Sequence, residues 1–85
     1  MRYSVYWGHK AEVGFMTSML RAVDKPALWK VAHAINNMLA DHPSTAGESR
    51  EEDWRILFVR PYSVLYSVDE MSRTVHVEQI KWVGS

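Results

Sequence analysis

Apolar and polar residues alternate along residues 54–68, and this stretch predicts two strands around which the rest of the chain is arranged. A period of two sends successive side chains to opposite faces of a strand, so each strand has one strongly apolar face. Pro61 has no N–H to give to a ladder, and we therefore place Arg60-Pro61 in a tight turn between the strands. We expect a helix-covered face formed by Ile56, Phe58, Val64, Tyr66, Val68, Val75 and Val77, and an open face formed by Arg55, Leu57, Ser63, Leu65, Ser67, His76 and Glu78.

The flanking segments predict two more strands and two helices. Alternation predicts strands over residues 2–7 and 74–83, and apolar spacings of three and four predict helices over residues 10–22 and 26–40. Asp24 is suited to cap the second helix, and Pro26 suits its first turn. The methionines Met16, Met19 and Met38 lie in the helical apolar stripes and are expected in the core, and residues 43–52 read as a polar loop.

The order β-α-α-β-β-β predicts the α+β class. Few residues join the two helices, so they should pack as an antiparallel hairpin. We expect this hairpin to return the chain to the end of the sheet where the first strand finished, which makes residues 54–59 antiparallel to residues 2–7. The predicted fold is an antiparallel four-stranded sheet with the helical hairpin on one face. The first strand then lies beside residues 54–59 or beside residues 74–83, and the sequence leaves both arrangements open.

Length and composition narrow the class of protein. Eighty-five residues predict one domain over residues 1–85, in which Gly84-Ser85 is as readily a cloning remnant as native sequence. The sequence contains no cysteine and no apolar run near the ~18–20 residues that span a bilayer, so we expect a cytoplasmic protein without membrane association. The formal net charge is zero, and the sequence lacks the basic stripe typical of a dedicated nucleic-acid binder.

Arg55, His76 and Glu78 are the candidate catalytic residues. If all three lie on the open face, they are within reach of one another and could perform acid–base or phosphate chemistry with the arginine stabilising negative charge. The alternative interpretation is a solvated face with a cross-strand ion pair, which is the commoner role of such residues. No histidine shares metal-ligand spacing with another ligand, so neither a metal nor a cofactor is expected.

Three tryptophans are candidates for binding a partner. Trp29 lies on the flank of its helix, and Trp54 and Trp82 lie near strand ends, where complete burial is not required. Half-exposed tryptophans are boundary residues in a lone domain, but they are frequent anchors in a protein with an obligate partner.

Several stretches in the same order as the predicted elements resemble the RelE/ParE toxin superfamily of bacterial toxin–antitoxin systems. They are YSVYW at residues 3–7 followed by Ala11, INNML at residues 35–39 leading to His42-Pro43, PYSVLYSVD at residues 61–69, and TVHVEQI at residues 74–80. The resemblance implies a toxin neutralised by a cognate antitoxin, which would cover part of the helix pair and a sheet edge. It also implies DNA gyrase, or the ribosome with its messenger RNA, as the target.

Departures from the family pattern concern the ribosome-dependent endonuclease branch, in which basic residues on the open face bind and cleave messenger RNA. Arg55 stands where that branch often has a lysine, Leu57 where it has a second lysine, and Ser63 where it has an arginine. The sequence also stops near Val83, where that branch continues into a catalytic tail. The resemblance therefore favours a ParE-like or catalytically weakened RelE-like toxin. An active messenger RNA endonuclease and a non-toxic interaction module remain as alternatives.

Overall fold

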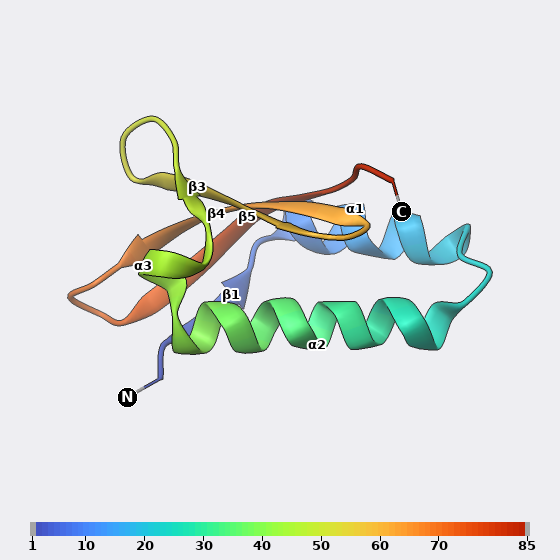
Figure 1. The fold of residues 1–85 in the computed structure, drawn as a ribbon, viewed down its shortest axis with the longest axis horizontal. Helices are drawn as coiled ribbons and strands as arrows, with labels where there is room; N and C mark the ends of the chain where they lie inside the picture. Colours follow the sequence, from blue (N-terminus) through green and yellow to red (C-terminus); the bar gives the residue numbers. More distant parts are fainter. Residues whose placement is uncertain (1, 85) are drawn as a thin grey trace.

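Five strands form one sheet in the order β1-β5-β4-β3-β2 in the computed structural model, which describes residues 2–84 (Figure 1). Ser85, half of the Gly84-Ser85 pair that the sequence leaves open as a cloning remnant or native sequence, lies outside these residues. The elements are β1 (Ser4–Trp7), α1 (His9–Leu20), α2 (Lys25–Asp41), α3 (Pro43–Ala46), β2 (Glu48–Ser49), β3 (Trp54–Val59), β4 (Tyr62–Asp69) and β5 (Thr74–Trp82). The α+β class and the predicted helices and long strands are confirmed, whereas α3 and β2 lie in the segment that was expected to be a loop.

The sheet is mixed, so the prediction of a wholly antiparallel sheet was wrong. β3, β4 and β5 form an antiparallel meander, but β1 pairs with β5 in parallel, with Ser4 opposite Thr74 and Trp7 opposite Val77. The expectation that residues 54–59 run antiparallel to the first strand is wrong for the same reason. Of the two positions left open for the first strand, the structure has the one beside the last strand.

The path of α1 explains this direction. The amide of Gly8 donates to the Val77 carbonyl (2.9 Å), and α1 then continues along β5 in the direction that β1 had taken. α2 then runs back past both α1 and β1. Near its end, the Ala40 carbonyl accepts a hydrogen bond from Tyr3 N (2.8 Å), which lies at the beginning of β1. The hairpin therefore delivers the chain to the start of β1 rather than to its end, and β3 runs parallel to β1.

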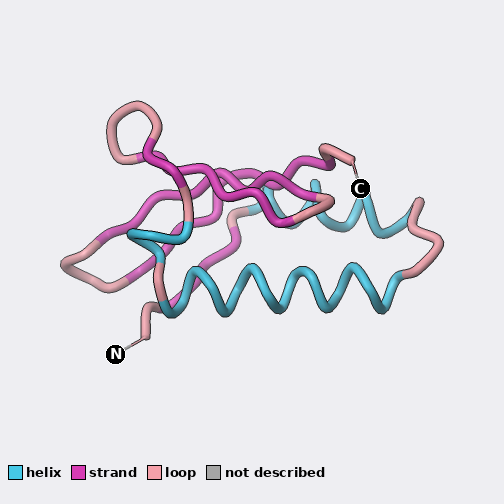
Figure 2. Tube along the Cα trace, in the orientation of Figure 1, coloured by secondary structure: helices cyan, strands magenta, loops and turns pink. Residues whose placement is uncertain are grey.

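Both long helices lie on one side of the sheet (Figure 2). Asp24 caps α2 as predicted, because its Oδ1 accepts a hydrogen bond from Ala27 N (3.1 Å). Gly14 allows α1 to approach β5 closely, since a Cβ at this position would lie 2.6 Å from the Ile80 carbonyl oxygen. The buried faces of both helices close over the sheet to form the core, which includes Phe15, Met19, Leu28, Ala32, Ile35, Leu39, Val64, Tyr66, Val75 and Val77.

The faces of β3 are the reverse of those predicted. Leu57 pairs with Val64 and is 5% exposed, whereas Phe58 pairs with Ser63 and is 58% exposed. Arg55 and Leu57 therefore point to the helix-covered face, and Trp54, Ile56 and Phe58 belong to the open face. The predicted faces of β4 and of Val75, His76 and Val77 are correct, and the β4–β5 register shifts so that Glu78 has no partner. Phe58 therefore faces away from the helices, where Ile35 of α2 is fully buried.

Candidate partner-binding surface

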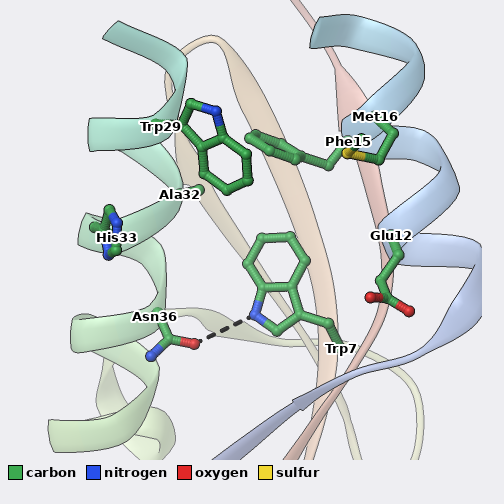
Figure 3. Close-up of a pocket in the computed structure, with 8 residues that line it drawn as sticks. All are labelled: Trp7, Glu12, Phe15, Met16, Trp29, Ala32, His33 and Asn36. Atoms are coloured by element: carbon green, nitrogen blue, oxygen red, sulfur yellow. Dashed lines mark hydrogen bonds between the residues drawn. The ribbon is translucent and has the colours of Figure 1, made fainter. Parts of the chain in front are cut away.

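A groove runs between α1 and α2 and is lined mainly by aromatic and apolar side chains (Figure 3). Its volume is about 320 Å³, and its lining residues are Trp7, Glu12, Phe15, Met16, Trp29, Ala32, His33 and Asn36. We call this the α1–α2 groove. Trp29 stands edge-on to Phe15 with ring centroids 5.2 Å apart, yet it remains 49% exposed. The predicted anchor Trp29 therefore lies in a preformed concave site rather than on a flat surface.

Apolar side chains continue from the groove over the outer side of α1. Val13, Met16 and Leu20 are spaced by three and four residues, so they share one side of the helix, and all three are exposed. The prediction that Met16 and Met38 belong to the core was wrong, since only Met19 of the three methionines is buried. A sequence signal existed, because the apolar residues of α1 cover more of its circumference than one buried face requires.

Trp82 lies on the other flank of α1. It lines a second depression of about 410 Å³ together with Gly14, Thr17, Ser18, Arg21 and Ala22, and it is 54% exposed. Its ring packs edge-on against Tyr62 (5.7 Å), and Tyr62 in turn contacts Phe15 (5.8 Å) below α1. We define the α1 surface as Val13, Met16, Leu20, Trp29 and Trp82. Val13, Met16 and Leu20 form an apolar ridge, with Trp29 on one side of it and Trp82 on the other.

Trp54 belongs to a different region. It begins β3 on the open face, where it is partly exposed and pairs with Ser67. The depression beside it is lined by four carboxylate residues, Glu52, Asp53, Asp69 and Glu70. The three candidate tryptophans therefore do not form one binding site.

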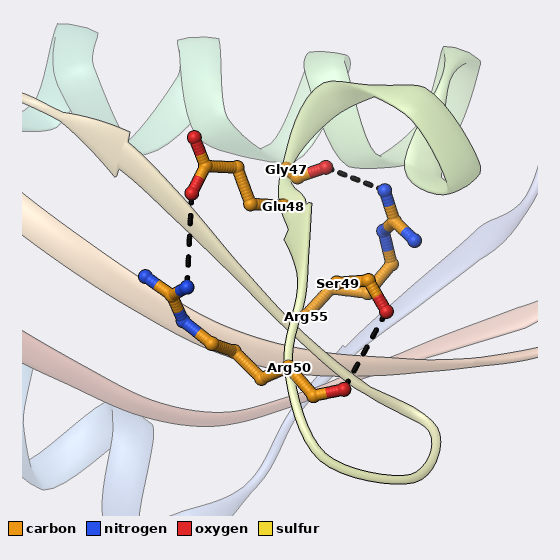
Figure 4. Close-up of polar contacts among 5 residues, drawn as sticks. All are labelled: Gly47, Glu48, Ser49, Arg50 and Arg55. Atoms are coloured by element: carbon orange, nitrogen blue, oxygen red, sulfur yellow. Dashed lines mark hydrogen bonds and ion pairs between the residues drawn. The ribbon is translucent and has the colours of Figure 1, made fainter.

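Arg55 is separated from His76, another candidate catalytic residue, by the sheet. Its Nη2 donates to the Gly47 carbonyl next to α3, and its Nε is buried without a hydrogen-bond partner (Figure 4). His76 and Glu78 belong to β5, and His76 pairs with Ser67 on the open face. The prediction that Arg55, His76 and Glu78 lie within reach of one another is thus wrong. Arg55 instead holds the end of α3 against β3.

The open face carries no basic residue on β3, where its positions are Trp54, Ile56 and Phe58. One basic side chain of β5 does lie on this face, because Lys81 is exposed and pairs with Ser63, an open-face position of β4. His76 lies beside Tyr6 of β1, with ring centroids 5.2 Å apart.

Among residues 2–84 no group of three histidine, aspartate or glutamate side chains is placed to hold a metal ion. Within the same residues no helix is long and apolar enough to cross a membrane.

A polar cluster joins the ends of several elements near the β4–β5 turn. Tyr3 Oη donates to Glu70 Oε1 (2.5 Å), and Ser44 Oγ donates to Glu70 Oε2 (2.8 Å). These two hydrogen bonds lower the pKa of the Glu70 carboxyl below its ordinary value of 4.5. The bond to Glu70 also raises the pKa of Tyr3 above 10.0. The cluster fastens the N-terminal segment and α3 to the turn.

The fold is that of known toxin–antitoxin proteins. No protein-family model and no curated protein match this chain. Solved structures do: the toxin–antitoxin complex RelBE2 of Mycobacterium tuberculosis matches with a TM-score of 0.79 at 19% identity, over 96% of this chain and 99% of that one. The chromosomal ParDE system of P. aeruginosa matches with 0.71 at 16% identity, over 95% and 96%.

The isolated E. coli RelE toxin shows which component is matched. It superposes with a TM-score of 0.68 at 15% identity, over 98% of this chain and 86% of that one. The chain therefore has the RelE/ParE toxin fold, and the resemblance found in the sequence is confirmed at the level of the fold.

Proposed function

We propose that this chain is the toxin of a bacterial type II toxin–antitoxin system and that a cognate antitoxin neutralises it by covering the α1 surface. The observation that carries the proposal is a chain with the toxin fold that leaves Leu20 80% exposed between two half-exposed tryptophans. Large apolar side chains gathered on one surface mark a protein-binding site. An antitoxin strand could extend the sheet beyond Ile56, where pairing between β2 and β3 ends.

The proposed activity is ParE-like inhibition of DNA gyrase or a weakened RelE-like action on the ribosome. Cleavage of a phosphodiester needs the developing negative charge to be stabilised, and loss of one preorganised donor typically costs about 10²–10³ in rate. Arg55, the residue expected to supply that charge, points to the covered face, and the outward positions of β3 are apolar. This arrangement supports a toxin that acts by binding rather than by cutting RNA.

Inducible expression in a bacterial host tests the proposal. We expect growth arrest that is relieved when the protein encoded by a neighbouring small gene is co-expressed. Growth that continues normally at the same level of expression would favour the alternative of a non-toxic interaction module.

The alternative of an active endonuclease rests on His76, which lies on the open face beside Tyr6 and close in sequence to Glu78. Purified protein should leave ribosome-bound messenger RNA largely intact when the products are mapped by primer extension. Robust cleavage that His76→Ala abolishes would establish the nuclease reading and make His76 a catalytic residue. Arg55→Ala serves as a comparison, since we expect it to loosen α3 rather than to remove an RNA contact.

A further inference from the structure

The open face carries an apolar strip that remains accessible to solvent. Trp54, Ile56 and Phe58 share one side of β3, and Leu65 of β4 pairs with Ile56 on the same side. Phe58 is 58% exposed, and the other three side chains are partly exposed. The solvent face of an antiparallel sheet usually carries polar side chains, so this strip is suited to lie against another apolar surface. We call these four residues the open-face strip.

The two ends of the open-face strip carry opposite charges. At the β3–β4 turn, Arg60 lines a depression of about 310 Å³ with Phe58, and Lys81 lies beside Ser63 in the same half of the face. At the other end, the depression beside Trp54 is lined by four carboxylate residues, Glu52, Asp53, Asp69 and Glu70. The six residues of β3 separate these ends by about 20 Å, which exceeds the Debye length of about 8 Å at physiological salt. Each end therefore acts as a separate charged group.

Charges at both ends are available to a second molecule. The two ion pairs found within residues 2–84 involve neither Arg60 nor Lys81, and they involve none of the four carboxylates. Glu70 is already hydrogen-bonded in the polar cluster, whereas Glu52 and Asp53 are exposed. The loop that carries Glu52 and Asp53 extends away from α2 (Figure 1). We call Arg60 and Lys81 the basic end of the face, and Glu52 and Asp53 its acidic end.

A second copy of the chain complements this face. Rotation by 180° about an axis that crosses the strands at Ile56 and Leu65 places the basic end of each copy over the acidic end of the other. The same rotation sets Phe58 of one copy over Trp54 of the other, because these residues lie two positions on either side of Ile56. Sheets that pack face to face in this way keep their strands nearly aligned and lie about 10 Å apart. A two-fold contact of this kind is self-complementary and closes after two copies.

We infer that the chain forms a two-fold symmetric homodimer through the open-face strip, with the basic end of each copy paired with the acidic end of the other. The formal net charge is zero, so two copies approach without overall repulsion. A nucleic acid fits this face less well, because the carboxylates at one end repel its phosphates. The long helices lie on the other side of the sheet, so the dimer leaves the α1 surface of each copy accessible (Figure 2). The inference does not depend on the proposed function.

Sedimentation velocity of the full chain over a range of concentrations tests the inference. We expect the mass to rise from that of one chain toward that of two, with a Kd on the order of 10 µM, as a small interface of mixed polarity provides. Phe58→Ala removes an aromatic contact from both halves of the interface and should raise the Kd by at least about tenfold. Leu20→Ala, at an exposed position of the α1 surface, is the matched control and should leave the Kd unchanged.

Charge reversal tests how the two ends are paired. Arg60→Glu combined with Lys81→Glu makes both ends of the face acidic. Glu52→Lys combined with Asp53→Lys makes both ends basic. Each double variant alone should remain monomeric, and an equimolar mixture should restore dimers, because an acidic copy then meets a basic copy at both contacts. Adding Phe58→Ala to both variants should abolish the mixed dimer, which distinguishes the proposed interface from unspecific attraction. Circular dichroism verifies that each variant is folded.

A chain that stays monomeric at concentrations about 100-fold above the expected Kd would overturn the inference. A mixture of the two double variants that stays monomeric, or that forms dimers insensitive to Phe58→Ala, would overturn it as well. Dimers that Leu20→Ala disrupts and Phe58→Ala does not would place the interface on the α1 surface instead. A monomer that binds single-stranded RNA, with Phe58→Ala preventing this binding, would assign the open-face strip to nucleic acid and contradict the homodimer.

Discussion

The open face of the sheet and the α1 surface both face solvent, but they expose different chemistry. The open face presents scattered apolar and polar groups, with Phe58 exposed on β3 and His76 on β5. The α1 surface presents the apolar ridge of Val13, Met16 and Leu20 between Trp29 and Trp82. In the resembled endonuclease branch the open face carries the basic residues that cleave RNA. In this chain large exposed apolar side chains gather on the helices instead, so the two faces of the same fold expose different chemistry.

The largest expected effect separates the covered face from the open face. Ile35→Ala removes a fully buried side chain of α2, and we expect a loss of about 2–5 kcal/mol in the free energy of unfolding. That is a large share of the stability of a domain of this size. Phe58→Ala removes a larger side chain from the open face and should cost much less. Chemical denaturation of both variants checks this, and equal losses would mean that the faces of β3 are assigned wrongly.

Those faces also show where the sequence alone was insufficient. Both sides of β3 are apolar, with Ile56 and Phe58 on one and Leu57 and Val59 on the other, so periodicity identifies the strand but not its orientation. The turn resolves the ambiguity: a two-residue connection at Arg60-Pro61 pairs Val59 with Tyr62. Val59 and Leu57 must then point to the same side as the buried Tyr62 and Val64.

Prediction of the direction of β1 and of the candidate site from the sequence was limited in similar ways. Helix positions, the Asp24 cap and the α+β class follow from local patterns and were predicted correctly. The parallel pairing of β1 depends on how far α2 runs past α1, which is a tertiary property. Trp29 was proposed from its place on the flank of its helix and Trp82 from its place near a strand end, whereas Val13 and Leu20 required knowing which side of α1 is buried. The prediction that Arg55, His76 and Glu78 lie together depended on the orientation of β3, and it was wrong because that orientation was predicted wrongly.

A smaller effect tests how α1 is seated on β5 next to the α1 surface. Gly14→Ala would bring a Cβ to 2.6 Å from the Ile80 carbonyl oxygen, and neither backbone can move without disturbing the core. We expect a loss of about 1–3 kcal/mol in stability, although alanine is the better helix former. Thr17→Ala, at an exposed position of the same helix, is the control and should be neutral or slightly stabilising. A stabilising Gly14→Ala would show that α1 lies farther from the sheet.

The smallest effect concerns the polar cluster at the opposite end from the α1–α2 turn. Because the pKa of Glu70 is lowered in the folded protein, its contribution to stability is present above pH 4.5 and is lost as the pH falls through the folded-state pKa. The raised pKa of Tyr3 contributes stability below pH 10.0 that is lost as the pH rises. Thermal unfolding across this range should show a shallower acid dependence for Glu70→Gln than for the unaltered protein. An identical acid dependence would mean that the cluster does not stabilise the fold.

Hydrogen exchange of the chain, alone and bound to the protein that relieves growth arrest, tests the central claim most directly. Apart from Trp7 and Trp82, the α1 surface and the α1–α2 groove belong to residues 9–41, and we predict the largest gain in protection there, with smaller changes at a sheet edge. The central part of the sheet, residues 63–69 of β4 and 74–79 of β5, serves as the internal reference within the same experiment. Protection confined to β4 and β5, with none added in residues 9–41, would contradict the account and make the open face the binding surface.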